Sequence, residues 1–274
     1  MKCIKHEGGK DMQQNCYSDV RTKCMSDAQT PLISVIIPIY NATAYINQTL
    51  SSILIQDVNC EVIAVEDPSE KMCTEIISSY QDRLTITHII NEQRQGPAEN
   101  RNIGIRLAKG QYIAFLDADD WWGSGKLLAQ LKLIEHMDCP FVYTGRRLVS
   151  YDGSKLGKVI HVPHQVDYQT LLKGNIIPAS SVLMKTDIAK SHEQHDDHLH
   201  EDYMMWLEIL QEYDFVYGIN TPFLFSRLSE GGKSRNKVKS AWMHWGVLRK
   251  MKLSIFQSLF YFVHYAIRGF MKYI

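Results

Sequence analysis

The fold is decided by residues 112–120, which read Tyr112-Ile113-Ala114-Phe115-Leu116-Asp117-Ala118-Asp119-Asp120. Five apolar residues in a row are typical of a buried strand. Three carboxylates follow this strand within four positions, and like charges so close together repel one another unless a cation offsets the repulsion. The stretch therefore predicts a buried strand that ends at a cation site. The alternative is a solvated acidic turn that caps a helix beginning near Gly123.

Short apolar runs upstream of this stretch alternate with helical patterns. Strands are predicted over 33–38, 60–65 and 84–90, the first of them ended by a proline. Helices are predicted from an N-cap at Asn41 to residue 54, and over 70–80 and 96–108, because apolar residues recur there at helical spacing. This alternation is typical of an α/β fold with a mostly parallel sheet and helices on both faces.

Polar groups gather where the predicted strands end. In a parallel sheet, ligands bind in the crevice beyond the carboxyl ends of the strands. The groups that fall at these ends are Pro38, Tyr40 and Asn41, then Glu66 and Asp67, and then the cluster 117–120. We therefore expect the three groups to converge on one crevice.

The C-terminal half is less regular. We expect strands over 141–150, 155–161, 180–184 and 223–227, helices over 167–173 and 201–211, a polar loop over 187–200, and two closing helices. Four histidines fall in or beside the polar loop, and their irregular spacing disfavours a metal site among them: His192, His195, His198 and His200.

The acidic cluster suits a hard cation. Mg²⁺ and Mn²⁺ prefer oxygen ligands, and Mg²⁺ typically binds one or two carboxylates together with substrate phosphates. Asp117, Asp119 and Asp120 are the candidate ligands, and the sequence leaves open which of them bind directly. Such a metal would neutralise the charge that develops on a diphosphate leaving group.

Three further motifs have two interpretations each. Asp67, with Glu66, can accept hydrogen bonds from a base or a ribose, or can simply open a turn. Arg101 lies in the early turns of a helix that follows Gly96, where it can bind phosphate or form a salt bridge. Asp202 opens a helix, where it can act as a general base or favour the helix dipole.

Charge is unevenly distributed along the 274 residues. The formal net charge is zero, so no nucleic-acid partner is predicted, yet residues 231–274 carry nine Lys and Arg and no Asp or Glu. Such a segment indicates an anionic partner. Apolar residues such as Phe256, Phe260 and Val263 recur there at helical spacing, which predicts an amphipathic helix in a membrane interface. A helix packed on the domain core is the alternative, and the segment is too polar and short to span.

The first 30 residues are polar and lack the apolar run of a secretory signal, so we expect a flexible tail. The tail holds Cys3, Cys16 and Cys24, half of the six cysteines, and a zinc site from these with His6 fits no common spacing. Cysteine usage indicates a reducing, cytoplasmic environment.

Taken together, residues 31–249 resemble the family-2 glycosyltransferases of the GT-A fold. Residues 34–41, Ser-Val-Ile-Ile-Pro-Ile-Tyr-Asn, are similar to the family's opening strand and loop. Residues 65–69 read Val-Glu-Asp-Pro-Ser where Val-Asp-Asp-Gly-Ser is usual, and residues 96–104 resemble Gly-x-x-x-Ala-Arg-Asn-x-Gly with Asn100 in place of alanine. The DxD signature matches Asp117-Ala118-Asp119, and Glu201-Asp202 matches the catalytic acid pair.

The resemblance implies a GT-A domain over 31–230, a mixed Rossmann-like sheet flanked by helices, and a basic C-terminal amphipathic helical extension over 231–274. It implies a UDP-sugar donor, Mn²⁺ or Mg²⁺, Asp202 as the base, and Glu201 and Trp206 at the acceptor site. The implied donor-site residues are Pro38, Tyr40, Asn41, Glu66, Asp67, Arg101, Asp117, Ala118 and Asp119.

The resemblance also implies an inverting reaction. The Gln-x-x-Arg-Trp motif of the processive synthases is absent, so one sugar would be added at a time. The C-terminal pattern is similar to bacterial enzymes that build lipid-linked intermediates of surface polysaccharide, such as O-antigen or capsule. It implies a lipid-linked saccharide acceptor and peripheral attachment at the inner face of the cell membrane.

Two alternatives stay open. Because Glu66 and Pro68 depart from the family pattern, the chain could be a catalytically inactive nucleotide-sugar-binding module. A different nucleotide-dependent transferase on a similar fold would typically need a glycine-rich basic loop after the first strand, and residues 38–41 supply none. The sequence does not name the sugar, the acceptor, the linkage or the oligomeric state.

Overall fold

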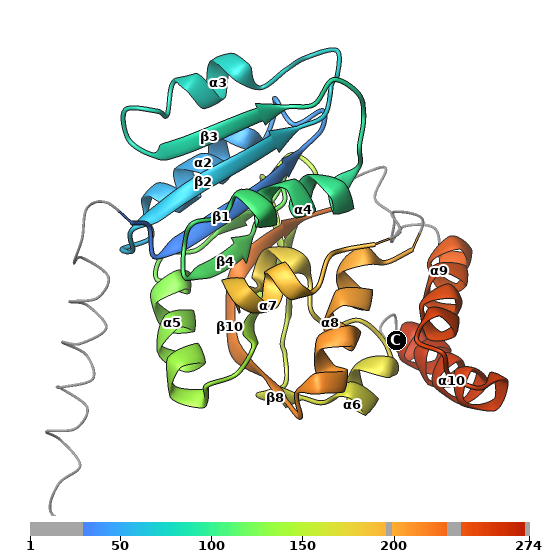
Figure 1. Cartoon of the computed structure of the whole chain (residues 1–274). Helices are drawn as coiled ribbons and strands as arrows, with labels where there is room; N and C mark the ends of the chain where they lie inside the picture. Colours follow the sequence, from blue (N-terminus) through green and yellow to red (C-terminus); the bar gives the residue numbers. More distant parts are fainter. Residues whose placement is uncertain (1–29, 196–198, 229–236, 272–274) are drawn as a thin grey trace, which may run out of the picture.

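The computed structural model describes residues 30–195, 199–228 and 237–271. Its centre is a ten-stranded sheet in the order β3-β2-β1-β4-β9-β6-β10-β5, with β7 beside β6 and β8 beside β10 (Figure 1). The strands are β1 (Ile33–Ile39), β2 (Cys60–Glu66), β3 (Thr85–Ile90), β4 (Tyr112–Phe115), β5 (Trp121–Trp122), β6 (Phe141–Val149), β7 (Leu156–Ile160), β8 (Gln165–Val166), β9 (Leu183–Lys185) and β10 (Val216–Arg227).

Helices cover both faces of this sheet. They are α2 (Ile46–Leu54), α3 (Thr74–Ser78), α4 (Pro97–Leu107), α5 (Lys126–Met137), α6 (Tyr168–Leu172), the 3₁₀ turn η1 (Ala179–Ser181), α7 (Thr186–Ser191), α8 (Glu201–Glu212), α9 (Lys237–Lys250) and α10 (Ile255–Met271).

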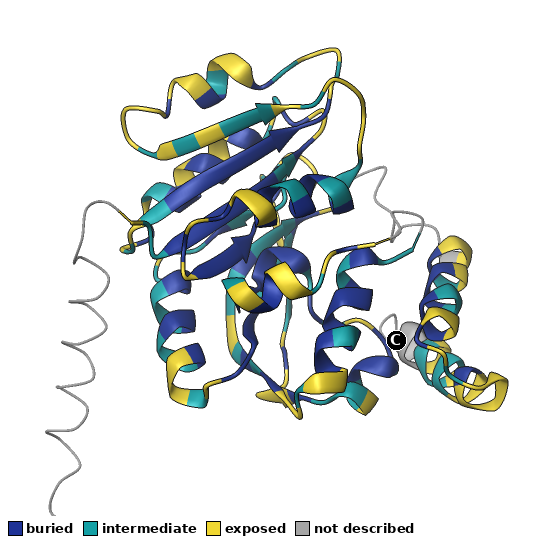
Figure 2. Ribbon diagram, in the orientation of Figure 1, coloured by how far each residue is buried: buried dark blue, intermediate teal, exposed yellow. Residues whose placement is uncertain are grey.

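Strand β1 shows how one run of sequence supplies both cores. Val35 and Ile37 pack in the cluster that includes residues of α2 and α5, whereas Ile36 packs in the cluster that includes residues of α4 and α8. Neighbouring side chains of a strand point to opposite faces, so a continuous apolar run is what a sheet covered on both sides requires. The central strands β1, β2 and β4 are accordingly buried over most of their length (Figure 2). The predicted α/β fold is confirmed.

The first four strands in sequence are parallel and end at one edge. Ile39 lies opposite Glu66 in the β1–β2 pair, and Glu66 lies opposite Ile90 in the β2–β3 pair. Strand β4 pairs in parallel with β1, with Phe115 opposite Ile36. Beyond β4 the sheet becomes mixed, because β9 runs antiparallel to both β4 and β6.

Helix α4 approaches β1 unusually closely. A Cβ on Gly104 would lie only 2.4 Å from Cγ2 of Ile36, so only glycine allows the helix to sit at this distance. This contact sets how close the preceding turn of α4, which carries Arg101, lies to the sheet.

Several predicted boundaries were wrong. Asn41 is not an N-cap: it has a positive φ of 51°, and α2 begins only at Ile46. The helix expected over 70–80 is limited to α3, and the start of the expected loop 187–200 is the helix α7. The last strand begins at Val216 instead of residue 223.

The two closing helices were predicted, and they pack on the domain. Val247 and Leu248 of α9, and Met251 directly after it, belong to the same core cluster as the apolar residues of α8. Figure 1 shows α9 and α10 beside α8 at one end of the molecule. Within the described ranges, no helix has the length and apolarity needed to cross a membrane. The predicted N-terminal tail, with Cys3, His6, Cys16 and Cys24, lies outside the described residues except for Thr30, and so does His198.

Candidate active site

The acidic loop 117–120 lies at the strand edge and is held by its backbone. Thr49 Oγ1 of α2 lies 2.8 Å from the carbonyl oxygens of both Ala118 and Asp120. Ser180 Oγ accepts a hydrogen bond from the Asp117 N–H, and Arg227 Nε donates to the Asp119 carbonyl. Hydrogen bonds with three separate parts of the chain therefore hold the backbone of the loop, and the carboxylates of the loop are not needed to fix its conformation.

The three carboxylates of the loop face different surroundings. Asp117 has a 37% exposed side chain, and Asp119 is partly buried. Burial and the neighbouring Asp117 raise the pKa of Asp119 to about 6. Asp120 is 6% exposed, and its Oδ1 accepts a hydrogen bond from the Arg227 N–H at 3.0 Å. Burial, Asp119 and Asp117 raise the pKa of Asp120 well above its ordinary value, so this side chain belongs to the protein interior.

The loop chemistry fits a hard divalent cation. The carboxylates of Asp117 and Asp119 are oxygen ligands whose mutual repulsion a cation would relieve, and two carboxylates plus substrate phosphates suffice for Mg²⁺. No preformed group of three or more His, Cys, Asp or Glu suitable for a metal occurs in the described part of the chain. The expected contribution of Asp120 as a direct ligand does not agree with its inward orientation.

Arg101 joins the acidic loop to the start of α8. Its guanidinium donates to Asp117 Oδ1 at 2.6 Å and to Glu201 Oε1 at 3.3 Å. Burial opposes the charge, but the carboxylates of Asp117 and Glu201 outweigh it and raise the pKa of Arg101. The side chain is 5% exposed and turned towards carboxylates, so the structure shows the salt bridge that was one interpretation of Arg101, and its binding of a diphosphate stays a prediction.

At the end of β2, the two neighbouring acids point in different directions. Glu66 accepts hydrogen bonds from the Cys73 N–H at 2.7 Å and lies 2.9 Å from His88 Nε2, so it is tied into the fold away from the crevice. This placement corrects the prediction that Glu66 contacts the nucleotide. The difference follows from the strand geometry, in which consecutive side chains alternate between faces.

Asp67 faces the loop that leads into α4. It accepts hydrogen bonds from the Gln95 and Gly96 N–H groups and from Asn91 Nδ2. Burial alone would raise the pKa of Asp67, but these hydrogen bonds outweigh it and lower the pKa, so Asp67 is an anion at neutral pH. Gly96, whose φ is 89°, directs its N–H towards Asp67 and not towards an open phosphate site.

The aromatic ring of Tyr40 is open at the same edge. Tyr40 is 42% exposed, and the guanidinium carbon of Arg94 lies 4.0 Å from its ring centroid. Pro38 is partly buried and Asn41 is exposed, so the first-strand residues line the edge where Asp67 and the acidic loop also lie.

At the start of α8, Glu201 pairs with Arg101, whereas the ion pairs of the described residues include none between Arg101 and the neighbouring Asp202. Its Oδ1 accepts the Tyr203 N–H at 2.7 Å, and Asn175 Nδ2 lies 3.4 Å from the same atom. Burial and then the adjacent Glu201 raise the pKa of Asp202 to about 7. A carboxyl group that exchanges its proton near neutral pH is suited to general acid–base chemistry.

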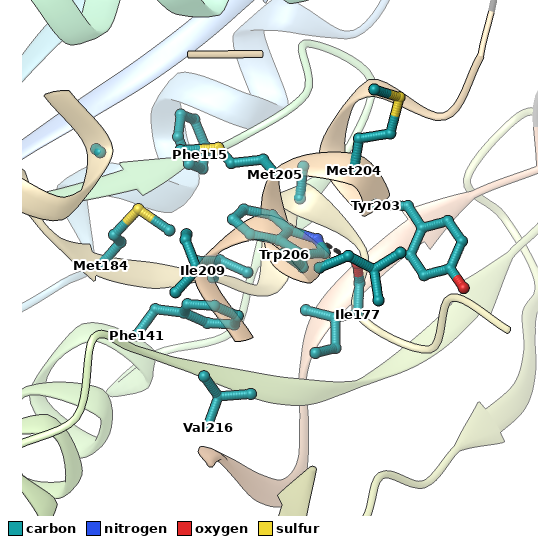
Figure 3. Packing of buried hydrophobic residues seen from close by; sticks show 14 of the residues in the cluster. Phe115, Phe141, Ile177, Met184, Tyr203, Met204, Met205, Trp206, Ile209 and Val216 are labelled. Carbon is teal, nitrogen blue, oxygen red and sulfur yellow. Dashed lines mark hydrogen bonds between the residues drawn. The ribbon is translucent and has the colours of Figure 1, made fainter. Parts of the chain in front are cut away.

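The two residues expected at the acceptor site are placed elsewhere. Glu201 is 7% exposed and bonded to Arg101. Trp206 is fully buried, with its ring 4.9 Å from that of Phe141 and its Nε1 donating to the Ile177 carbonyl (Figure 3). Trp206 lies on the core side of α8, four residues after Asp202, and its packing holds this helix against the core.

Arg227 contacts the acidic loop, and the sequence interpretation missed it. Arg227 also donates to Gln48 Oε1 and to the Tyr151 carbonyl, and its guanidinium lies 4.6 Å from the ring of Tyr45. Burial lowers the pKa of Arg146 on β6, against the opposing influence of Asp120 and Asp202. Arg227 could have been found from the sequence, because it is a cation at the end of the apolar run Phe223-Leu224-Phe225-Ser226-Arg227.

Comparisons with known proteins show the family of the chain. The model of the family "Glycosyl transferase family 2" matches residues 34–193. The chain is 34% identical over 241 residues to the putative teichuronic acid biosynthesis glycosyltransferase TuaG of Bacillus subtilis (strain 168), covering 86% of this chain and 95% of the relative. It is 31% identical over 244 residues to the Escherichia coli UDP-Glc:alpha-D-GlcNAc-diphosphoundecaprenol beta-1,3-glucosyltransferase WfgD, covering 88% of this chain and 94% of that protein.

Solved structures show the same fold at low identity. Residues 1–349 of S. aureus TarS in complex with UDP-GlcNAc superpose with a TM-score of 0.70 and 19% identity, over 87% of this chain and 72% of TarS. The Pyrobaculum calidifontis mannosyltransferase PcManGT in complex with GDP-Man and Mn²⁺ gives a TM-score of 0.63 and 15% identity, over 89% of this chain and 75% of that one. Both likenesses confirm the predicted GT-A architecture.

Proposed function

The chain belongs to glycosyl transferase family 2, and on that premise we propose that it is an inverting, non-processive enzyme that transfers one sugar from a UDP-sugar to a hydroxyl group of a saccharide acceptor. The observation that carries the proposal is the contact chain Asp117–Arg101–Glu201. It connects the acidic loop to Asp202, the one carboxyl group of α8 whose pKa is raised to about 7.

The donor lies along the strand edge. Tyr40 supplies an exposed ring for the base, and Asp67 supplies a carboxylate that can accept a base N–H if the Gln95–Gly96 loop adjusts. Asp117 and Asp119 are the residues that would hold Mn²⁺ or Mg²⁺ beside the donor diphosphate. When bound, the cation neutralises the charge that the departing diphosphate acquires.

Asp202 removes the proton from the acceptor hydroxyl. The hydroxyl oxygen forms a bond to the anomeric carbon from the face opposite the leaving group, the bond from that carbon to the UDP oxygen breaks, and UDP departs with the bonding electrons. The proton stays on Asp202 until solvent takes it. An α-linked donor therefore gives a β-linked product, and the name of the relative WfgD gives a β-1,3 linkage for its own reaction.

We propose a lipid-linked saccharide of surface-polysaccharide synthesis as the acceptor, brought by contact with the cytoplasmic face of the membrane. The name of WfgD, which includes a diphosphoundecaprenol-linked GlcNAc, supports this acceptor class, and the name of TuaG supports a role in teichuronic acid biosynthesis for that relative. The exposed face of α10 supports the location: Phe256 is 85% exposed, and Leu259 and Phe260 are more than half exposed. An apolar helix face of this kind, in a segment without acids, is typical of a helix that lies in a membrane interface.

The test is the substitution Asp202→Asn, assayed by UDP release from UDP-glucose with a short-chain GlcNAc-diphospho-lipid acceptor. We expect a loss of activity of about 10²–10⁴-fold, the usual contribution of a general base. UDP binding with Mn²⁺, followed by thermal shift, should stay intact because Asp202 is not a donor ligand.

The matched control is Asp214→Asn, the same change at an exposed position beyond the end of α8, which should leave both readouts unchanged. Full transfer by the Asp202→Asn protein would refute the assignment of the base. UDP release by neither protein with any UDP-hexose would refute the proposed function.

A further inference from the structure

Helix α9 contacts the chain on both sides of the acid pair Glu201-Asp202. Before the pair, Leu199 packs on the backbone of α9: a Cβ on Gly246 would come within 2.6 Å of Leu199 Cδ2. His200 Nε2 lies 3.5 Å from Ser240 Oγ of α9. After the pair, the ring of Tyr203 stacks on His244 of α9, with the centroids 5.6 Å apart and the planes at 11°.

His244 is the centre of a three-helix stack. Its other face meets Tyr265 of α10 at 4.1 Å and 14°, and the Tyr265 hydroxyl lies 3.1 Å from Ser240 Oγ. The side chain is 1% exposed, and burial, followed by the influence of His200, lowers the pKa of His244 to about 3. In the described structure its Nε2 has no hydrogen-bond partner. The neutral ring therefore acts through packing and not through charge.

A second set of contacts connects the same aromatic stack to Asp202. Tyr265 Cδ2 lies 3.5 Å from the position that a Cβ on Gly174 would occupy. The next residue, Asn175, places its amide 3.4 Å from Asp202 Oδ1. On the other side, Asp202 Oδ1 accepts the N–H of Tyr203, the residue that stacks on His244. The two groups that contact the Asp202 carboxylate are thus both next to the aromatic stack.

We infer that His244 is a positioning residue for the catalytic base, and that α9 and α10 are part of the active-site structure in addition to any role at a membrane. The inference rests on the proposed function, in which Asp202 is the base. Misplacement of a reacting group by about 1 Å can cost on the order of 10²-fold in rate, so the packing of a ring behind the base is enough to control turnover.

The experiment compares His244→Ala, His244→Phe and Trp242→Ala in the full chain, with UDP-glucose and the short-chain GlcNAc-diphospho-lipid acceptor. We expect His244→Ala to lower kcat by about 10–100-fold while donor KM stays within about twofold, because Tyr40, Asp67 and the acidic loop lie on other elements. His244→Phe keeps the stack and removes an unpartnered buried nitrogen, so it should retain most of the activity. Trp242, 72% exposed on α9, is the aromatic-to-alanine control and should behave as wild type.

Two further measurements keep the inference testable if His244→Ala folds poorly. Gly246→Ala pushes against Leu199 and should lower kcat several-fold at unchanged donor KM. Amide hydrogen exchange of residues 199–205 should accelerate in His244→Ala but not in His244→Phe. A wild-type kcat in both His244→Ala and Gly246→Ala, or an equal loss in His244→Phe, would overturn the inference while leaving an active wild-type enzyme. Transfer that survives Asp202→Asn would instead overturn the proposed function.

Discussion

At the scale of single residues, Arg101 decides how the site is arranged. One buried guanidinium bonds a carboxylate after β4 and another at the start of α8, residues that are 84 positions apart in the sequence. Removing one partner of a buried charge network leaves the others unpaired and is strongly destabilising. The arginine therefore keeps Asp117 oriented and holds Asp202 close to the donor edge.

The pKa of Asp202 predicts the pH dependence of transfer. Burial and Glu201 raise this pKa to about 7, so the carboxylate that accepts the proton is the minor form below pH 7 and the major form above it. We expect kcat to fall about tenfold per pH unit below 7 and to level off above about pH 8. The measurement is kcat at saturating donor and acceptor between pH 5 and 9, with unfolding checked at each pH. A flat profile between pH 5 and 8 would contradict the assignment.

The acidic loop predicts unequal effects of two identical substitutions. Asp119→Asn removes a proposed metal ligand, so the Mn²⁺ concentration needed for UDP binding should rise by about 10–100-fold or more. Asp120→Asn keeps an oxygen that can accept the Arg227 N–H, and it replaces a side chain whose raised pKa already favours the neutral form, so Mn²⁺ dependence should change little. Titration of Mn²⁺ in a UDP thermal-shift assay distinguishes the two. A larger loss in Asp120→Asn would mean that Asp120 reaches the metal.

Sequence reasoning identified the right strand ends but not which side chains face the crevice. Asp67 and Glu66 are adjacent, and their directions depend on which face of β2 meets His88 and Cys73, contacts made only in the folded chain. The direction of Trp206 could not be predicted for the same reason. Helical spacing shows that it shares a helix with Asp202, but only its packing against Phe115 and Phe141 shows that it is buried. The roles of Asp117, Asp119 and Asp202 stay predictions.

At the scale of elements, the N-terminal half was more predictable than the C-terminal half. Its strands β1, β2 and β4 are largely buried on both faces, so their apolar runs are continuous and conspicuous. Strand β10 was only half recognised because Asn220-Thr221-Pro222 in its middle resembles a turn, and the structure indeed shows a register shift there. Short elements such as α7 and β9 depend on tertiary contacts more than on local pattern.

Helix α10 gives a prediction about membrane contact. Phe256→Ser combined with Phe260→Ser removes two exposed rings, and each buried ring of this size contributes roughly 1.5–3 kcal/mol, so binding to anionic vesicles should weaken by at least about tenfold. The assay is co-sedimentation with phosphatidylglycerol-containing vesicles. Ile55→Ser combined with Leu156→Ser, two exposed apolar residues on other elements, is the matched control. Equal vesicle binding by both double variants would refute a membrane role for this face.

At the scale of the whole molecule, the predicted boundary at residue 230 separates the GT-A domain from a C-terminal helical region. In the structure, helix α9 of that region packs on the core of the domain. The sequence pattern predicted that residues 231–274 attach the protein to a membrane because the segment is basic. Charged side chains lie on the exposed side of a helix, so they do not show what the opposite side packs against. The inner surface of α9 carries Val247 and Leu248, and Met251 follows the helix directly. All three are part of the core that holds α8. A helix can be both amphipathic towards an interface and packed on the domain, so the two interpretations of the C-terminal segment are compatible.

This packing predicts what truncation does. A chain that ends at residue 236 exposes the core surface now covered by three large side chains, each of which contributes roughly 1.5–3 kcal/mol when buried. The loss, about 4.5–9 kcal/mol, is comparable to the whole stability of many domains, which is about 5–15 kcal/mol. We therefore expect the truncated protein to unfold at much lower urea concentration, and to lose transfer together with vesicle binding. The Phe256→Ser, Phe260→Ser protein should instead keep the wild-type unfolding midpoint, because its substitutions are on the outer face. A truncated chain with an unchanged midpoint would show that α9 and α10 are a separable appendage, and deletion would then be the cleaner test of membrane attachment.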